Sequence, residues 1–244
     1  MNEPKRSLEV DSIRLAALLG ICIVNLPFMG LPVESVFYPP DGWHNKAAVF
    51  LVECLFQLKF FTLFSFIFGW GLAIQEKNAV SKGQPLRQRY FRRMAGLLVL
   101  GVLHATLVFS GDILALYALL GTALWILREK PARTLTRIAL CMIPLSMLCL
   151  GLLALIIETY VLNTPVPYDT ISTGNTSEIN LGGNYADTLR YRLADWPGTF
   201  AFLVLLQGPL AFAAFLTGLA AAKSNFFAAN SSSFALLQLS LIHI

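Results

Sequence analysis

Residues 102–121 read VLHATLVFSGDILALYALLG, an apolar run that contains one histidine, His104, and one aspartate, Asp112. Ionisable side chains are expensive inside a membrane and usually mark a functional site there. These two residues are therefore the first candidates for chemistry. The Ser110-Gly111 pair between them predicts a tight turn that joins two short helices into a hairpin.

The composition of the whole chain is that of a membrane protein. Of its 244 residues, 56% are hydrophobic and only 13% are charged, and the mean hydropathy is +0.65. Because a soluble domain carries roughly 25% charged residues, we predict an all-α integral membrane protein, a polytopic helical bundle in the lipid bilayer. The net charge of +4 is interpreted as membrane topology and not as nucleic-acid binding. The four cysteines lie in apolar segments without metal-ligand spacing, so no metal site is predicted.

Six segments are apolar enough to cross a hydrocarbon core of about 30 Å, which takes roughly 20 helical residues. They lie near residues 12–31, 48–75, 94–109, 112–127, 138–161 and 198–222. Residues 1–11 are then a cytoplasmic N-terminus, and residues 12–222 form the transmembrane bundle. Residues 223–244 are a polar linker with an apolar tail too short to span a bilayer, which is interpreted as a cut inside a further span.

The lysines and arginines predict the orientation. With the N-terminus in the cytoplasm, thirteen of the 18 basic residues fall in cytoplasmic segments and three fall in outer loops. Because basic residues accumulate on the cytoplasmic side, the N-terminus is predicted to be cytoplasmic. The predicted location is the bacterial inner (cytoplasmic) membrane, with multiple passes.

The first span carries polar residues of its own. Arg14 and Asn25 are eleven residues apart, which is three helical turns, so they share one face of the helix. Asp11 and Arg14, at i and i+3, can form an ion pair at the cytoplasmic end. The alternative is an interfacial ion pair with no function beyond anchoring.

The second span places Lys59 near the middle of the membrane. A lysine there costs roughly 2.5 to 3.5 kcal/mol unless it finds a carboxylate or water. Asp112 is its preferred partner, because Glu53 on the same helix is rotated to a different face. The alternatives are a structural salt bridge for Lys59, a helix N-cap role for Asp112 and a hydrogen-bonded core role for His104. Five polar residues project to the outer half of the membrane, which predicts a hydrated cavity open to the outside. They are Asn25, Glu53, Lys59, His104 and Asp112.

Two further patterns concern the inner side and the packing. Residues 77–93 hold six positive charges, which could attract the phosphates of a nucleotide-like donor or anionic lipid headgroups, although the positive-inside rule explains them without either. Gly69, Gly71, Gly96 and Gly101 predict close helix packing.

Four patches of the sequence resemble the YeiB-like bacterial membrane proteins of unknown function, whose members are longer than this chain. The patches are DSIRLAALLGI at 11–21 with Asn25, KFFTLFSFIFG at 59–69, GVLH at 101–104 and GDIL at 111–114. The resemblance implies a distant kinship with transmembrane acyltransferases, such as the heparan-glucosaminide acetyltransferase and the acyltransferase-three group.

In the acyltransferase-three group an arginine is followed, after ten residues, by a membrane histidine. Arg14 has this spacing to Asn25, which cannot act as a base. By this comparison the base must come from elsewhere, either His104 or the loop residue His44.

Three functions remain open on the sequence. The first is acyl transfer from a cytoplasmic thioester, with acyl-coenzyme A as donor, to a sugar-like acceptor outside. His104 would be the general base and Asp112 would hold its tautomer, while Lys59 orients the pair and Arg14 contacts the donor phosphates. The second is a proton-coupled transporter that uses His104, Asp112 and Glu53 as a relay. The third is a membrane scaffold in which the polar residues only set helix register.

Overall fold

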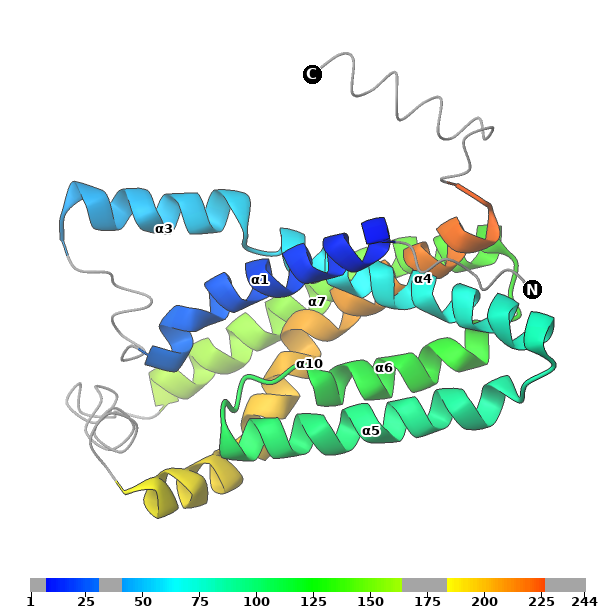
Figure 1. Ribbon diagram of the computed structural model, residues 1–244. Coiled ribbons are helices and arrows are strands. Elements are labelled where there is room, and N and C mark those ends of the chain that lie inside the picture. The colour runs from blue at the N-terminus through cyan, green and yellow to red at the C-terminus, as the bar shows by residue number, and fades with distance from the viewer. Residues whose placement is uncertain (1–7, 31–40, 164–183, 227–244) are drawn as a thin grey trace, which may run out of the picture.

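The computed structural model describes residues 8–30, 41–163 and 184–226, and over these residues the chain is helical with no strand (Figure 1). The elements are α1 (Leu8–Gly30), α3 (Trp43–Leu55), α4 (Lys59–Lys82), α5 (Leu86–Leu107), α6 (Leu114–Leu127), α7 (Ala132–Asn163) and α10 (Tyr185–Lys223). The prediction of an all-α membrane protein is confirmed. The extreme N-terminus and the short apolar tail lie outside the described residues.

Four helical stretches are long and apolar enough to cross a membrane by length and composition: Asp11–Met29, Trp43–Lys82, Ala132–Thr159 and Tyr185–Lys223. The apolar helix α6 is shorter, with 14 residues. The six predicted spans correspond in order to α1, to α3 with α4, and then to α5, α6, α7 and α10.

Helix α10 lies at the centre of the bundle. It packs along α4 and α7 and also contacts α6 and α5. Three aromatic rings from three helices meet in this core: Phe68 stacks on Phe215 with ring centroids 4.5 Å apart, and Tyr117 meets Phe215 edge-on at 5.0 Å. Such contacts add about 0.5 to 1.5 kcal/mol each to the burial of the rings, so α4, α6 and α10 are held as one unit.

Glycines allow α4 and α10 to approach at backbone distance. A Cβ added at Gly69 would lie 1.9 Å from the backbone oxygen of Phe215, and one at Gly218 would lie 2.0 Å from that of Phe66. The close-packing role predicted for Gly69 is therefore confirmed. Gly96 is different, because nothing lies within 4 Å of a Cβ added there.

The second predicted span is not one straight helix. Helix α3 ends at Leu55 and α4 begins at Lys59, and Leu58 between them has left-handed backbone angles, with φ 62° and ψ −29°. None of the residues of α3 is buried, and in Figure 1 α3 stands away from the rest of the bundle. The span predicted over 48–75 is thus broken near its middle.

The last helix begins earlier than expected. The sequence predicts an outer loop up to residue 197, but α10 starts at Tyr185 and continues through Pro197 and Pro209. The side chain of Asn184 caps this start by accepting a hydrogen bond from the backbone N–H of Ala186 at 3.2 Å. About three turns of the predicted loop are therefore helix.

The two ends of the bundle differ in what they carry. The turn between α5 and α6 lies at one end, and the loop between α4 and α5 lies at the other (Figure 1). At this second end, the Lys223 ammonium donates to the backbone oxygens of Arg128 and Lys130, the latter at 3.0 Å, which satisfies carbonyls just beyond α6. The predicted cytoplasmic end is therefore held together by its own basic residues.

Candidate functional site

The turn from α5 to α6 brings His104 and Asp112 together. Gly101 permits this packing, since a Cβ added there would lie 2.4 Å from the backbone nitrogen of Ala115 and 2.9 Å from Oδ2 of Asp112. The first turn of α6 therefore rests directly on the backbone of α5. The close-packing prediction for Gly101 is confirmed.

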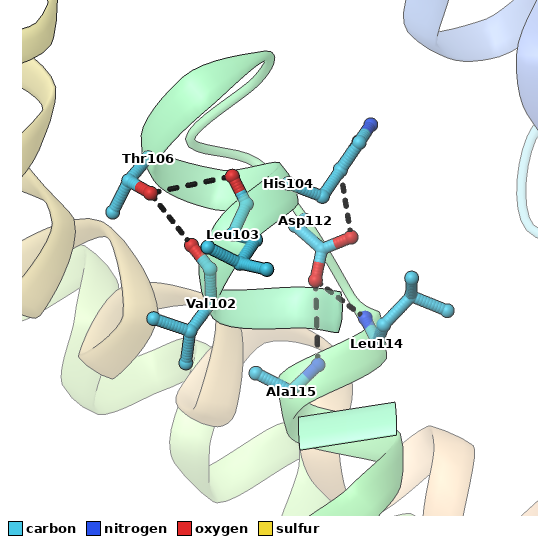
Figure 2. Close-up of polar contacts among 7 residues, drawn as sticks. All are labelled: Val102, Leu103, His104, Thr106, Asp112, Leu114 and Ala115. Atoms are coloured by element: carbon cyan, nitrogen blue, oxygen red, sulfur yellow. Dashed lines mark hydrogen bonds and ion pairs between the residues drawn. The ribbon is translucent and has the colours of Figure 1, made fainter. Parts of the chain in front are cut away.

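The imidazole of His104 and the carboxylate of Asp112 form a direct hydrogen bond. His104 Nδ1 lies 2.9 Å from Oδ1 of Asp112 (Figure 2). Oδ2 of Asp112 accepts from the backbone N–H groups of Leu114, at 2.8 Å, and Ala115, at 3.3 Å. The side chain of Asp112 therefore caps the first N–H groups of α6, one residue before the N-cap position Ile113, and is also the partner of the histidine; the sequence left these two roles as alternatives.

When Asp112 is ionised, this geometry selects one tautomer of the neutral histidine. An ionised carboxylate can only accept hydrogen bonds, so the proton of the neutral ring lies on Nδ1 and the lone pair lies on Nε2. Asp112 is only 5% exposed, whereas the side chain of His104 is 40% exposed. In Figure 2 the far side of the ring points away from Asp112. The pair thus has the form of a buried orienting carboxylate and an accessible base.

Lys59 does not pair with Asp112, and the predicted partnership is wrong. Both oxygens of Asp112 are engaged by His104 and by the start of α6. Lys59 is exposed and forms no ion pair with any carboxylate among the residues whose side chains the structure describes. The physical reason is that Asp112 already has partners on both oxygens, while Lys59, the first residue of α4 after the break at Leu58, lies on the exposed surface.

Lys59 instead lines the same cleft as Glu53, although their spacing in the sequence predicts different faces of one helix. Glu53, Gln57, Lys59 and Thr62 line an open cleft of about 430 Å³, together with Leu58 and Leu210. The break between α3 and α4 brings these side chains to one surface, although an unbroken helix would place Glu53 on another face.

Asn25 is not connected to these groups. Its amide donates to the backbone oxygen of Ile21 at 3.0 Å, one turn back on its own helix. Among the described residues, no hydrogen bond or ion pair links Asn25, Glu53 or Lys59 to the histidine and aspartate. The single polar layer expected from the sequence therefore divides into separate groups.

Arg14 lies in another cleft. Its Nη1 is 3.1 Å from Oδ1 of Asp11, so the predicted i,i+3 pair is confirmed. Arg14 also lines a cleft of about 350 Å³ with Arg89 and Arg93, at the predicted cytoplasmic side. His44, the other candidate base, lies in the first turn of α3, where its ring meets that of Trp43 edge-on at 5.7 Å.

Two contacts near the histidine were not predicted from the sequence. The backbone oxygen of Leu107, three residues after His104, accepts from the Tyr185 hydroxyl at 3.1 Å and from Nη1 of Arg192 at 3.0 Å. These donors satisfy a carbonyl at the C-terminal end of α5. Because the polar residues before Pro197 predict a loop, no sequence signal placed them on a helix beside α5.

No group of three or more histidine, cysteine or acidic side chains in the described ranges is arranged to hold a metal ion. His104 and Asp112, as a hydrogen-bonded pair, offer acid–base and hydrogen-bonding chemistry.

Comparisons with known proteins agree with the family resemblance stated from the sequence. The chain is 36% identical to the uncharacterized protein YxaH of Bacillus subtilis over 136 residues, which are 52% of this chain and 33% of that protein. It is 32% identical to the uncharacterized protein YeiB of Escherichia coli over 138 residues, again 52% of this chain and 33% of that protein. Over about half of its length, the chain is therefore similar to these two proteins.

A further similarity, 30% over 112 residues, is to an uncharacterized 39.9 kDa protein of Bacillus acidopullulyticus. The matched region spans about a third of the curated relatives' own length. No family model and no solved structure matches the chain. Since these relatives are themselves uncharacterized, the argument for a function depends on the residues of this chain.

Proposed function

We propose that this chain takes part in acyl transfer, from a thioester donor supplied by the cytoplasm to a hydroxyl-bearing acceptor on the outer side of the membrane. The observation that carries the proposal is the hydrogen bond of 2.9 Å between His104 Nδ1 and Asp112, with the His104 side chain 40% exposed and the far edge of its ring pointing away from Asp112 (Figure 2). An imidazole oriented by a carboxylate is the common base in acyl transfer to a hydroxyl group.

The reaction would proceed by addition and elimination. Nε2 of His104 removes the proton of the acceptor hydroxyl as its oxygen attacks the thioester carbonyl, which forms a carbon–oxygen bond. The tetrahedral adduct then collapses, the carbon–sulfur bond breaks, and the thiolate takes the proton from the imidazolium. Asp112 stabilises the imidazolium while it exists, because the carboxylate lies beside Nδ1. Acyl-coenzyme A is the proposed donor, and no tightly bound cofactor is needed.

The test uses the purified full-length protein in lipid nanodiscs with radiolabelled acetyl-coenzyme A. Transfer to added sugars and hydrolysis to acetate are both measured. His104→Gln should lower the rate about 100-fold to 10,000-fold, the usual contribution of a general base. His44→Gln is the matched control and should retain the activity. Activity in His104→Gln equal to that of the parent would refute the proposal.

A cellular measurement complements the assay. A deletion strain complemented with the parent gene or with His104→Gln is compared for acylation of its envelope glycans. The proposal expects loss of one acyl modification in the deletion strain and restoration only by the parent gene. An unchanged envelope in the deletion strain would count against an extracytoplasmic acceptor of this class.

A second candidate, proton-coupled transport, is favoured by the broken helix. Transporters often place their ion and substrate sites where a spanning helix is interrupted near the middle of the membrane. Here the interruption lies beside Glu53 and Lys59, which line one cleft. Proton flux into proteoliposomes, followed with an internal pH-sensitive dye, should then depend on Glu53. If the proton flux of Glu53→Gln equals that of the parent protein, this second function is excluded.

A further inference from the structure

Three arginines from two helices face one cleft at the end of the bundle opposite the histidine. Arg14 comes from α1, Arg89 and Arg93 come from the first two turns of α5, and α4 forms the remaining wall with Gly71, Ile74 and Gln75. The cleft has a volume of about 350 Å³, within the range of sites that bind small molecules. The chemistry proposed for His104 and Asp112 does not involve this group.

The charges of the cleft are not balanced. Asp11 pairs with Arg14, but Arg89 and Arg93 form no ion pair with any carboxylate whose side chain the structure describes. Two of the three guanidinium groups are therefore available to an anion from outside the chain. Guanidinium groups recognise phosphate with paired, charge-assisted hydrogen bonds.

Two of the three guanidinium groups, those of Arg93 and Arg14, contact the helices around them. Arg93 lies over the ring of Phe68, with its central carbon 5.0 Å from the ring centroid, and Phe68 is buried. Arg14 rests on Gly71, where a Cβ would lie 3.7 Å from its Nη2. Gln75 is fixed by donating to the backbone oxygen of Gly71 at 3.0 Å. Groups fixed in advance lose less entropy when a ligand binds.

The positive-inside rule does not account for this convergence. That rule concerns the number of basic residues near the ends of the spans and not their direction. Arg87 and Arg92 satisfy it equally well on the same helix, and both are exposed outside the cleft. Arg14, by contrast, lies within the first predicted span and still faces the same cleft as two arginines from a distant part of the chain.

We infer that Arg14, Arg89 and Arg93 form a binding site for a phosphate-bearing ligand at the predicted cytoplasmic side of the bundle. The identification of this ligand as the acyl donor rests on the proposed function. The existence of a phosphate-binding site does not. Arg93 and His104 lie eleven residues apart on one face of α5, so the site and the base are separated by about 16 Å along the helix. An extended thioester arm attached to a diphosphate has a comparable length.

The test measures binding of inorganic pyrophosphate to the full chain in nanodiscs of phosphatidylcholine, by isothermal titration calorimetry. Arg89→Gln is compared with Arg87→Gln, since both residues are exposed in the first turn of α5 and only Arg89 lines the cleft. Arg89→Gln should weaken binding about tenfold, the effect of losing one charge-assisted contact, while Arg87→Gln stays within about twofold. Arg93→Gln is compared with Arg92→Gln in the same way, with thermal unfolding as the check that each variant is folded.

A second experiment distinguishes a soluble phosphate-bearing ligand from a lipid headgroup. Native mass spectrometry of the chain purified from membranes that contain phosphatidylglycerol reports whether that lipid stays bound. Pyrophosphate binding without retained lipid indicates a soluble ligand, and retained lipid that is lost in Arg89→Gln but not in Arg87→Gln indicates a lipid headgroup. The inference is overturned if neither probe binds, or if Arg87→Gln and Arg89→Gln weaken binding equally. Because neither arm contains a thioester donor and both measure only binding, this result is independent of whether acyl transfer occurs.

Discussion

The hairpin turn between α5 and α6 and the break between α3 and α4 each carry an acidic and a basic side chain, yet they are built in different ways. At the hairpin, Asp112 is buried and hydrogen-bonded to His104 and to the start of α6. At the break, Glu53 and Lys59 are exposed and line an open cleft without an ion pair. A polar residue in an apolar run therefore gains fixed hydrogen-bond partners where the backbone around it is closely packed. Its expected depth in the membrane is not sufficient.

The largest expected effect tests the orienting role of Asp112. Asn at this position can still cap α6, but it lacks the negative charge that stabilises an imidazolium and can present its amide nitrogen to Nδ1. Asp112→Asn should therefore lower acyl transfer by about 100-fold or more while the midpoint of thermal unfolding changes little. Asp112→Ala should lower both, since the cap contributes about 0.5 to 2 kcal/mol. If Asp112→Asn retains full activity, the hydrogen bond to His104 is only structural.

The next effect concerns the packing that fixes the hairpin. Gly101 and Gly96 lie on the same helix, but a Cβ at Gly101 meets the backbone of Ala115 at 2.4 Å and one at Gly96 meets nothing within 4 Å. Gly101→Ala should destabilise the protein by about 1 to 3 kcal/mol through overpacking. Gly96→Ala should instead stabilise it by up to about 1 kcal/mol, because alanine is the better helix former. Unfolding in a detergent titration followed by circular dichroism measures both, and changes of the same sign would contradict the close approach of α6.

The same two regions show how far the sequence could predict the structure. The hairpin was predictable because Ser110 and Gly111 interrupt two apolar segments, and the spacing of eight residues across such a turn allows His104 to meet Asp112. The break was not, because residues 56–58 are Phe, Gln and Leu, with neither glycine nor proline to signal it. The left-handed backbone at Leu58 therefore has no local sequence signal.

The early start of α10 has a similar explanation. Residues 185–196 contain two arginines and two aspartates, a composition typical of an outer loop, and Pro197 follows them. The helix forms there because Asn184 caps it and because Tyr185 and Arg192 bind the end of α5. Such contacts join residues about 80 positions apart, as the separations of 78 and 85 show, and helical periodicity carries no information about them. In the sequence, the three arginines of the cleft are likewise recognisable only as separate charges, and their convergence cannot be predicted.

A smaller effect tests the left-handed backbone conformation of Leu58 at the break between α3 and α4. Leu58 has φ 62°, a conformation that costs a residue with a Cβ roughly 1 to 2 kcal/mol relative to glycine. Leu58→Gly should therefore leave the free energy of unfolding unchanged or raise it by about 1 kcal/mol. The matched variant Leu51→Gly, inside α3 and similarly exposed, should lower it by up to about 1 kcal/mol, as glycine does within helices. A continuous helix through residue 58 would instead make both substitutions destabilising.

The smallest effect tests whether Lys59 is unpaired. Removing one partner of a buried ion pair usually costs about 3 to 5 kcal/mol, because the other charge is left without compensation. Lys59 is exposed and lies in an open cleft, so Lys59→Gln should change the free energy of unfolding by no more than about 0.5 kcal/mol. The double variant Lys59→Gln with Asp112→Asn should then show additive effects on unfolding, as expected for sites that share no contact. A coupling of 1 kcal/mol or more between these two substitutions would restore the partnership predicted from the sequence and would place the break and the hairpin in one site.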